Sequence, residues 1–202
     1  MNCQEILTTL VAYRSKISEV LGVDPGSIQI ASQYSFITVS VNDNEIHVEF
    51  EITGKASKIS QLYCSNKFTE ADTRKKLESI TWAGLESIHD KPSWPADVLN
   101  YIQAADDVAK LAVNCARGDS YQPGNFSKVM ISKDHIELQQ TNHMNAKSLD
   151  HKKDYSLRSL VFRIPLNVVG EMEVRFSDNS SENNKHCGDK IKVALKELSL
   201  ID

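Results

Sequence analysis

Apolar side chains recur along this chain at two different spacings, and the spacing changes several times. From residue 3 to residue 21 they recur every three or four positions, which predicts an amphipathic helix. From residue 28 to residue 52 they recur at every second position, which predicts strands with one buried face. The segment from Asn42 to Asn44 interrupts the second pattern and predicts a turn, because Asn and Asp tolerate left-handed backbone. A chain that changes period in this way must pack helices against a sheet.

The alternation of periods continues through the rest of the chain. Thr69 followed by Asp72 resembles a helix capping box, and the expected helix runs to about residue 88. A second helix is expected over 98–117, after a proline-containing break, and two helices joined so closely are expected to pack as an antiparallel pair. The remaining expectations are strands near 58–64, 129–131, 136–138, 160–164 and 172–176, polar loops at 141–156 and 177–188, and a last helix that begins at Asp189.

The expected order of elements is helix, three or four strands and helix, then helix, about four strands and helix. We therefore predict an α+β fold in which a mostly antiparallel sheet is covered by helices on one face. The break at Pro92 divides the chain into segments of similar pattern, which indicates two tandem units over residues 1–92 and 93–202. The alternative is a single domain over residues 1–202, in which one continuous sheet uses all the strands.

Charge and hydropathy narrow the classes of partner. The 202-residue chain has 23 Lys+Arg and 27 Asp+Glu, and this net charge of −4 disfavours nucleic acid, whose binding draws on clustered basic residues. No apolar run approaches the roughly 20 residues that cross a bilayer, so no membrane is expected as a partner. The first residues lack the basic and apolar regions of an export signal, and the four cysteines lack a CxxC spacing. A cytoplasmic location with reduced thiols is expected.

The most patterned polar feature is an acidic stripe in the third expected strand. Its members occupy odd positions, so they point to one side of the strand while the apolar residues point to the other. One interpretation is a solvated outer face of an antiparallel sheet. The other is half of an electrostatically complementary protein interface. The stripe consists of Asp43, Glu45, His47, Glu49 and Glu51.

A basic segment lies in the second half of the chain. Together with the acidic stripe it suggests two-sided recognition of a partner, or self-association. The alternative is an ordinary flexible loop, since loops are generally polar. The basic residues of this segment are Lys147, Lys152, Lys153 and Arg158.

Signatures of catalysis are absent from the sequence. It contains no GxSxG elbow, no phosphate-binding GxxxxGK[ST] loop, no GxGxxG and no HExxH. The histidines have no spacing that matches a closed zinc site, so no metal and no cofactor are expected. Asp134 and His135 are adjacent, but they fall in an expected hairpin turn, where Asp is common for reasons of local hydrogen bonding.

These observations favour a non-enzymatic cytoplasmic module that binds another protein, as an adaptor, inhibitor or chaperone does. The acidic stripe and the basic segment are its expected contact residues, and a second copy of the chain is the alternative partner. The alternative function is a small hydrolase or transferase, because a catalytic site can be assembled from residues that are distant in sequence.

Overall fold

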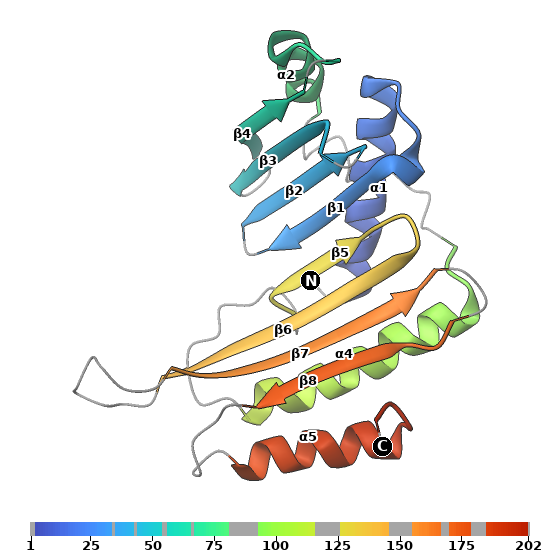
Figure 1. Ribbon diagram of the computed structural model, residues 1–202, viewed down its shortest axis with the longest axis vertical. Helices are drawn as coiled ribbons and strands as arrows, with labels where there is room; N and C mark the ends of the chain where they lie inside the picture. The colour runs from blue at the N-terminus through green and yellow to red at the C-terminus, as the bar shows by residue number, and fades with distance from the viewer. Residues whose placement is uncertain are drawn as a thin grey trace.

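The computed structural model describes residues 3–33, 35–42, 44–53, 56–65, 67–80, 93–115, 126–145, 155–166, 170–178 and 185–201. These residues form one eight-stranded sheet with helices packed against it, so the predicted α+β class and antiparallel sheet are confirmed (Figure 1). No described helix is both long enough and apolar enough to cross a membrane. In chain order the elements are α1 (Cys3–Leu21), the short 3-10 helix η1 (Pro25–Ser27), β1 (Ile28–Gln33), β2 (Phe36–Val41), β3 (Ile46–Thr53), β4 (Ala56–Cys64), α2 (Glu70–Glu78), α4 (Ala96–Cys115), β5 (Lys128–Ile131), β6 (His135–Asn145), β7 (Tyr155–Pro165), β8 (Glu173–Asp178) and α5 (Lys185–Glu197).

The strand order of the sheet is β4-β3-β2-β1-β5-β6-β7-β8, and each neighbouring pair is antiparallel. The order is symmetric about the central pair, because β1 to β4 run outward on one side and β5 to β8 run outward on the other. At this central seam Ile30 lies opposite Ile131, and Gln33 lies opposite Lys128. The division at residue 92 stays a prediction, since residues 81–92 lie outside the described part of the chain.

Helices α1, α2 and α4 pack on one face of the sheet, and α5 packs against α4 (Figure 1). Helix α1 contacts both β1 and β5, so it crosses the seam. Helix α2 packs against β4 and α1, whereas α4 packs against β6, β7 and α5. Helix α2 ends at Glu78 rather than near residue 88, and the expected antiparallel packing of the two middle helices is not found between the described helices α2 and α4. Residues 81–92 of the expected pair lie outside the described part of the chain. Helices α2 and α4 each bury apolar residues against a different half of the sheet.

The core is a single layer between the helices and the sheet. In β2 the side chains of Ile37, Val39 and Val41 are buried in it, while the intervening residues point to the opposite face. One tilted aromatic pair, Tyr13 with Phe50, has its ring centroids 6.0 Å apart. A second pair lies on the β5–β8 side, where the rings of Phe126 and Phe162 meet edge to face at 6.3 Å.

The turn between β2 and β3 follows the sequence prediction. Asn42 has φ = 46° and Asn44 has φ = 76°, the left-handed conformation that Asn adopts more readily than most residues. The hydroxyl of Ser40 donates to Asn44 Oδ1 at 2.6 Å, which fixes the turn from the strand side.

Three local predictions needed correction. Strand β6 extends to Asn145 and β7 begins at Tyr155, so part of the polar loop predicted at 141–156 is paired strand. Ladder hydrogen bonds use only the backbone, so a hairpin can continue through polar residues that break the apolar pattern. The last helix begins at Lys185 rather than at Asp189. Thr69 precedes α2 as predicted, but its hydroxyl donates to Asp72 Oδ2 at 2.7 Å instead of capping a backbone N–H.

Candidate binding face of the sheet

The side of the sheet opposite the described helices, here called the open face, is lined mainly by polar side chains. Strand alternation turns every second residue toward it. On β1 these residues include Gln29 and Gln33, and on β2 they include Thr38 and Ser40, all uncharged. The outward positions of β1 and β2 therefore form an uncharged band, whereas β5, on the other side of the seam, carries Lys128 on this face.

The acidic stripe lies on the open face along β3. His47, Glu49 and Glu51 alternate with the buried residues of that strand, and Glu45 lies in the turn before it. The fifth member of the stripe, Asp43, is outside the described residues. In the register of the sheet, Glu49 lies between Thr38 of β2 and Gln61 of β4.

The carboxylates of the stripe differ in the hydrogen bonds and ion pairs that offset their negative charge. Glu45 accepts from Lys67 Nζ at 2.7 Å and from Asn42 Nδ2 at 3.0 Å, and these bonds lower the pKa of Glu45. Glu49 accepts from the hydroxyl of Ser60 at 2.6 Å. Within the described residues, neither Glu49 nor Glu51 forms an ion pair with a lysine or arginine. In the register of the sheet, Lys58 of β4 lies opposite Glu51, whereas the neighbours of Glu49 are uncharged.

Charges on the other half of the open face neutralise one another. Glu137 of β6 lies between Met130 and Arg163 in the register, and Arg163 in turn lies opposite Glu173. Lys128 Nζ approaches Glu137 Oε1 at 3.5 Å. Cross-strand neighbours of opposite sign stabilise a sheet locally, so this half has the character of an ordinary solvated surface.

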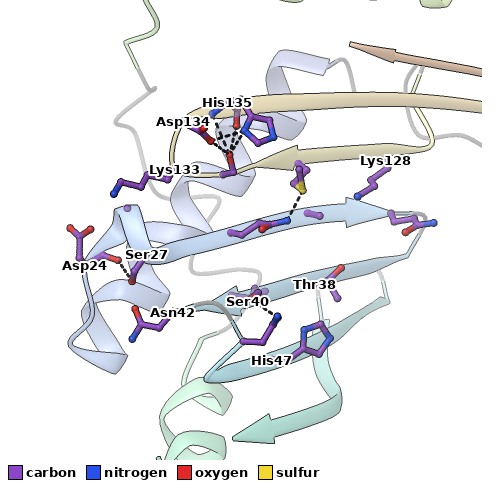
Figure 2. Close-up of a pocket in the computed structure, with 18 residues that line it drawn as sticks. Asp24, Ser27, Thr38, Ser40, Asn42, His47, Lys128, Lys133, Asp134 and His135 are labelled. Carbon is purple, nitrogen blue, oxygen red and sulfur yellow. Dashed lines mark hydrogen bonds and ion pairs between the residues drawn. The ribbon is translucent and has the colours of Figure 1, made fainter. Parts of the chain in front are cut away.

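A hollow of about 850 Å³ lies over the central strands of the open face (Figure 2). Its floor includes Ala31 and Met130, which are 7% and 6% exposed although they point away from the helices. Gln29 Nε2 donates to the sulfur of Met130 at 2.8 Å across the seam. Thr38 and Ser40 line the hollow from β2, His47 lines it from β3, and three chain turns close one end. The hollow therefore adjoins the strand that carries the acidic stripe.

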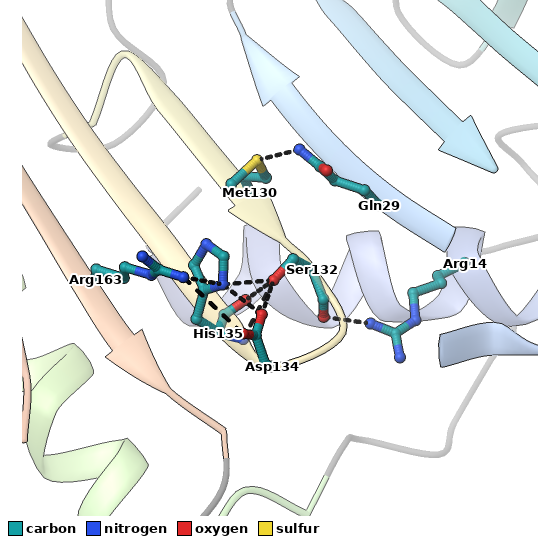
Figure 3. A network of polar contacts seen from close by, with 7 residues as sticks. All are labelled: Arg14, Gln29, Met130, Ser132, Asp134, His135 and Arg163. Atoms are coloured by element: carbon teal, nitrogen blue, oxygen red, sulfur yellow. Dashed lines mark hydrogen bonds and ion pairs between the residues drawn. The ribbon is translucent and has the colours of Figure 1, made fainter. Parts of the chain in front are cut away.

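A compact hydrogen-bonded cluster occupies the β5–β6 turn at the rim of the hollow (Figure 3). The Oγ atom of Ser132 and the Oδ1 atom of Asp134 each lie 2.7 Å from Nδ1 of His135. Ser132 Oγ also donates to Asp134 Oδ1 at 3.0 Å, and Arg163 Nη2 lies 3.9 Å from Asp134 Oδ2. The hydrogen bonds from His135 and Ser132 lower the pKa of Asp134.

This cluster contains the residue types of a hydrolytic triad without its geometry. In a triad the carboxylate orients one imidazole nitrogen and the serine uses the other. Here both Ser132 and Asp134 meet the same nitrogen, Nδ1. Ser132 Oγ also accepts from the backbone N–H of His135 at 3.2 Å. The cluster therefore holds the turn in shape, as local side-chain bonding does in many tight turns.

The basic segment is only partly described. Lys147, Lys152 and Lys153 lie outside the described residues. The backbone of Arg158 lies in β7 opposite Asn142 and Asp178, so this residue belongs to the sheet rather than to a loop.

The hollow was not predictable from the sequence. The sequence pattern related to it is the series of uncharged polar residues at the outward positions of β1 and β2. This pattern indicates a hollow only when it is known that these strands lie near the middle of the sheet. Among the described residues, no group of three His, Cys, Asp or Glu side chains could hold a metal ion. No protein-family model, curated protein or solved structure matches the chain.

Proposed function

We propose that this protein is a non-enzymatic binding module that captures another protein on the open face of its sheet. The observation that supports the proposal most directly is the acidic stripe on the open face of β3, where Glu49 has uncharged neighbours and lies opposite Thr38, a residue that lines the hollow. Like charges on one strand repel unless water, salt or a partner compensates them. A partner that presents basic groups would remove this repulsion on binding.

The dimensions of the open face fit one side of a protein interface. Eight strands leave seven spacings of about 4.8 Å, and strands of six residues are about 20 Å long, so the face covers roughly 700 Å². A standard interface buries about 800 Å² on each partner. Nucleic acid suits this face less well, because phosphates would meet the carboxylates of the acidic stripe.

The proposal also includes a cellular role for the protein. We place the module in the cytoplasm, where it would act as an adaptor, inhibitor or chaperone, and a second copy of the chain is the alternative partner. No arrangement among the described residues favours the hydrolase or transferase alternative, because the Ser132 cluster lacks the geometry of a triad.

The test is affinity capture with a charge-reversed open face. The tagged protein and the double variant Glu49→Lys/Glu51→Lys are incubated with lysate of the native host at about 50 and 300 mM salt, between which the screening length falls from about 14 Å to about 6 Å. We expect the unaltered protein to retain a stoichiometric partner at low salt, with weaker retention at high salt. The charge-reversed variant should lose that partner.

A matched control carries the same change of net charge elsewhere. Glu78→Lys/Glu197→Lys reverses two exposed carboxylates on helices α2 and α5 and leaves the open face untouched. The control variant should retain the partner. Equal loss in both double variants would mean that only net charge matters, and undiminished capture by the Glu49/Glu51 variant would contradict the proposal.

A further inference from the structure

We infer that the two halves of the sheet are copies of one unit, and that the seam joins them as the interface of a twofold-symmetric dimer joins its subunits. The first unit consists of α1, the strands β1 to β4 and α2, and the second consists of α4, the strands β5 to β8 and α5. This inference goes beyond the proposed function and does not depend on it. It is carried by the strand registers, the pattern of burial and the pairing at the seam.

The first observation concerns the two central hairpins, which have the same register. The hairpin of β1 and β2 becomes the hairpin of β5 and β6 when every residue number is increased by the same amount. The turn at the end of each hairpin follows the same rule, since the N–H of Ser132 donates to the carbonyl of His135 at 2.9 Å. The matching pairs are Gln29/Ser40 with Lys128/Gln139, Ser32/Ile37 with Ile131/Ile136, and Gln33/Phe36 with Ser132/His135.

The outer strands continue this correspondence. The third strand of each unit lies between the second and the fourth at matching residues, which are Val39, Val48 and Leu62 in the first unit and Leu138, Phe162 and Val174 in the second. The match between β4 and β8 extends to Glu49, beyond which the register of β3 on β4 shifts. The second unit has the longer hairpin, because β6 continues to Asn145 and β7 begins at Tyr155.

Burial follows the same correspondence. Residues at matching positions of the second and third strands point into the core and are at most 2% exposed, as in the pairs Ile37/Ile136, Val39/Leu138 and Phe50/Ile164. The counterpart of Val41 is Gln140, which is also buried and donates to the carbonyl of Ala109 on α4. Each unit therefore turns the same side of the same strands toward its helices.

The seam shows how the two units are related in space. It joins the first strand of one unit to the first strand of the other, and the pairing is antiparallel. Like strands that pair in this way are exchanged by a twofold axis perpendicular to the sheet. Ala31 and Met130 are counterparts in the hairpins and lie opposite each other at the seam, so the axis passes between them. The hollow therefore lies over the axis.

The helices keep their order but break the symmetry at the seam. Helix α1 packs on α2 in the first unit, and α4 packs on α5 in the second. However, α1 contacts both β1 and β5, whereas α4 contacts β6 and β7. The twofold relation is thus a property of the sheet, and α1 covers the seam for both units.

The outward residues of the two units differ where the buried residues agree. Thr38 corresponds to Glu137, and Glu49 corresponds to Arg163. The two units therefore share one type of core but present different charges on either side of the hollow. The open face lacks the twofold symmetry of its backbone, so a partner that itself has twofold symmetry would not find equal contacts on the two sides.

The test reverses the order of the units in the intact chain. In the first circular permutant, residues 93–202 precede residues 1–92, and a Gly/Ser linker of about 20 residues, which spans roughly 25 Å on average, joins the former ends. The control permutant has the same linker but opens between Leu149 and Asp150, in the connection from β6 to β7. Each unit stays continuous in the first permutant, whereas the control divides the second unit.

Thermal melts monitored by circular dichroism compare the two permutants with the unaltered protein. We expect the first permutant to melt within about 5 °C of the unaltered protein and the control at least about 10 °C lower, because the pairing of β6 with β7 must then close a much longer loop. Equal losses in two folded permutants, or a larger loss in the first, would overturn the inference.

A crystal structure of the unaltered protein decides the matter if neither permutant folds. Residues 28–33 and 36–41 are superposed on residues 127–132 and 135–140, and the inference requires a rotation within about 10° of 180° that exchanges Ala31 with Met130. A rotation outside that range would overturn it.

Discussion

The guanidinium of Arg14 on α1 donates a hydrogen bond of 3.1 Å to the backbone carbonyl of Ser132, at the end of β5. The two residues are 118 positions apart, and Ser132 directly follows β5, the first strand of the β5–β8 half of the sheet. Because α1 also packs on both β1 and β5, this bond adds a polar connection to an apolar one. The first helix therefore joins the two halves of the sheet.

Substitution of Arg14 should destabilise the protein more than substitution of a neighbouring surface charge. Burial lowers the pKa of Arg14, and replacement by methionine leaves the carbonyl of Ser132 without its charged donor. We expect Arg14→Met to reduce the free energy of unfolding by about 1–3 kcal/mol. Lys16→Met is the control, since it breaks only the exposed pair with Glu19 and should cost less than about 1 kcal/mol. Urea denaturation measures both, and equal costs would contradict this role for Arg14.

Because β1 and β5 pair at the seam, we expect the separated halves of the chain to reassemble. Fragments 1–92 and 93–202, when co-expressed, should co-purify one-to-one, because β1 and β5 each lose a strand partner on separation. Ile131→Asp in the second fragment should abolish the association, since it places a charge in the core at the seam. Size-exclusion chromatography shows whether the two fragments elute together. Two fragments that fold and remain apart would contradict the importance of the seam.

Gln140 should be a stabilising residue of the core. It is 1% exposed, and its Nε2 donates to the carbonyl of Ala109 on α4 at 2.8 Å. We expect Gln140→Leu to cost about 1–3 kcal/mol, because it removes a buried hydrogen bond between sheet and helix. Gln139→Leu, at the next position and on the open face, should change stability by less than about 0.5 kcal/mol. A thermal melt in which both variants match the unaltered protein would show that the bond contributes nothing.

The β5–β6 turn should lose stability on the acid side. The pKa of Asp134 is lowered below its usual value of 3.8 by hydrogen bonds from His135 and Ser132, so its ionised form is the one that stabilises the fold. That contribution is complete above the unfolded pKa and disappears as the pH falls through the lower, folded pKa. The melting temperature of the unaltered protein should therefore exceed that of Asp134→Asn at pH 6, and the two should converge toward pH 2. A difference that is independent of pH would refute this assignment.

Cys3 should resist thiol reagents in the folded protein. Burial, followed by the nearby charge of Asp106, raises the pKa of Cys3 to about 12, so at pH 8 about one thiol in ten thousand is ionised. Iodoacetamide followed by peptide mass spectrometry should leave Cys3 unmodified, while the half-buried Cys64 reacts. In urea both should be modified. Rapid labelling of Cys3 in the folded state would show that the first turn of α1 opens readily.

Local structure was predictable because its causes are local. The alternation of apolar residues in β2 and β3 determines which side chains face the core, and it correctly put Glu49 and Glu51 on one side of β3. The turn at Asn42 was predictable for the same reason, since its left-handed backbone depends on that residue and its immediate neighbours. The helical period also sufficed to locate α1.

Strand order was not predictable, because it depends on contacts between distant residues. Ile30 pairs with Ile131, yet the apolar pattern of β1 suits several other strands of the chain equally well. The hollow depends on that order: Gln29, Thr38 and Met130 come together only when β1 lies between β2 and β5. Likewise, the unequal compensation of the acidic carboxylates depends on which strands flank β3.

The measurement that tests the central claim most directly is site-specific photo-crosslinking in lysate of the native host. A benzoylphenylalanine is placed at position 38, in the hollow, and separately at position 107, an exposed site on α4. The account predicts one defined crosslinked protein from position 38 and none from position 107. Crosslinking from position 107 alone, or from neither position, would contradict a binding role for the open face.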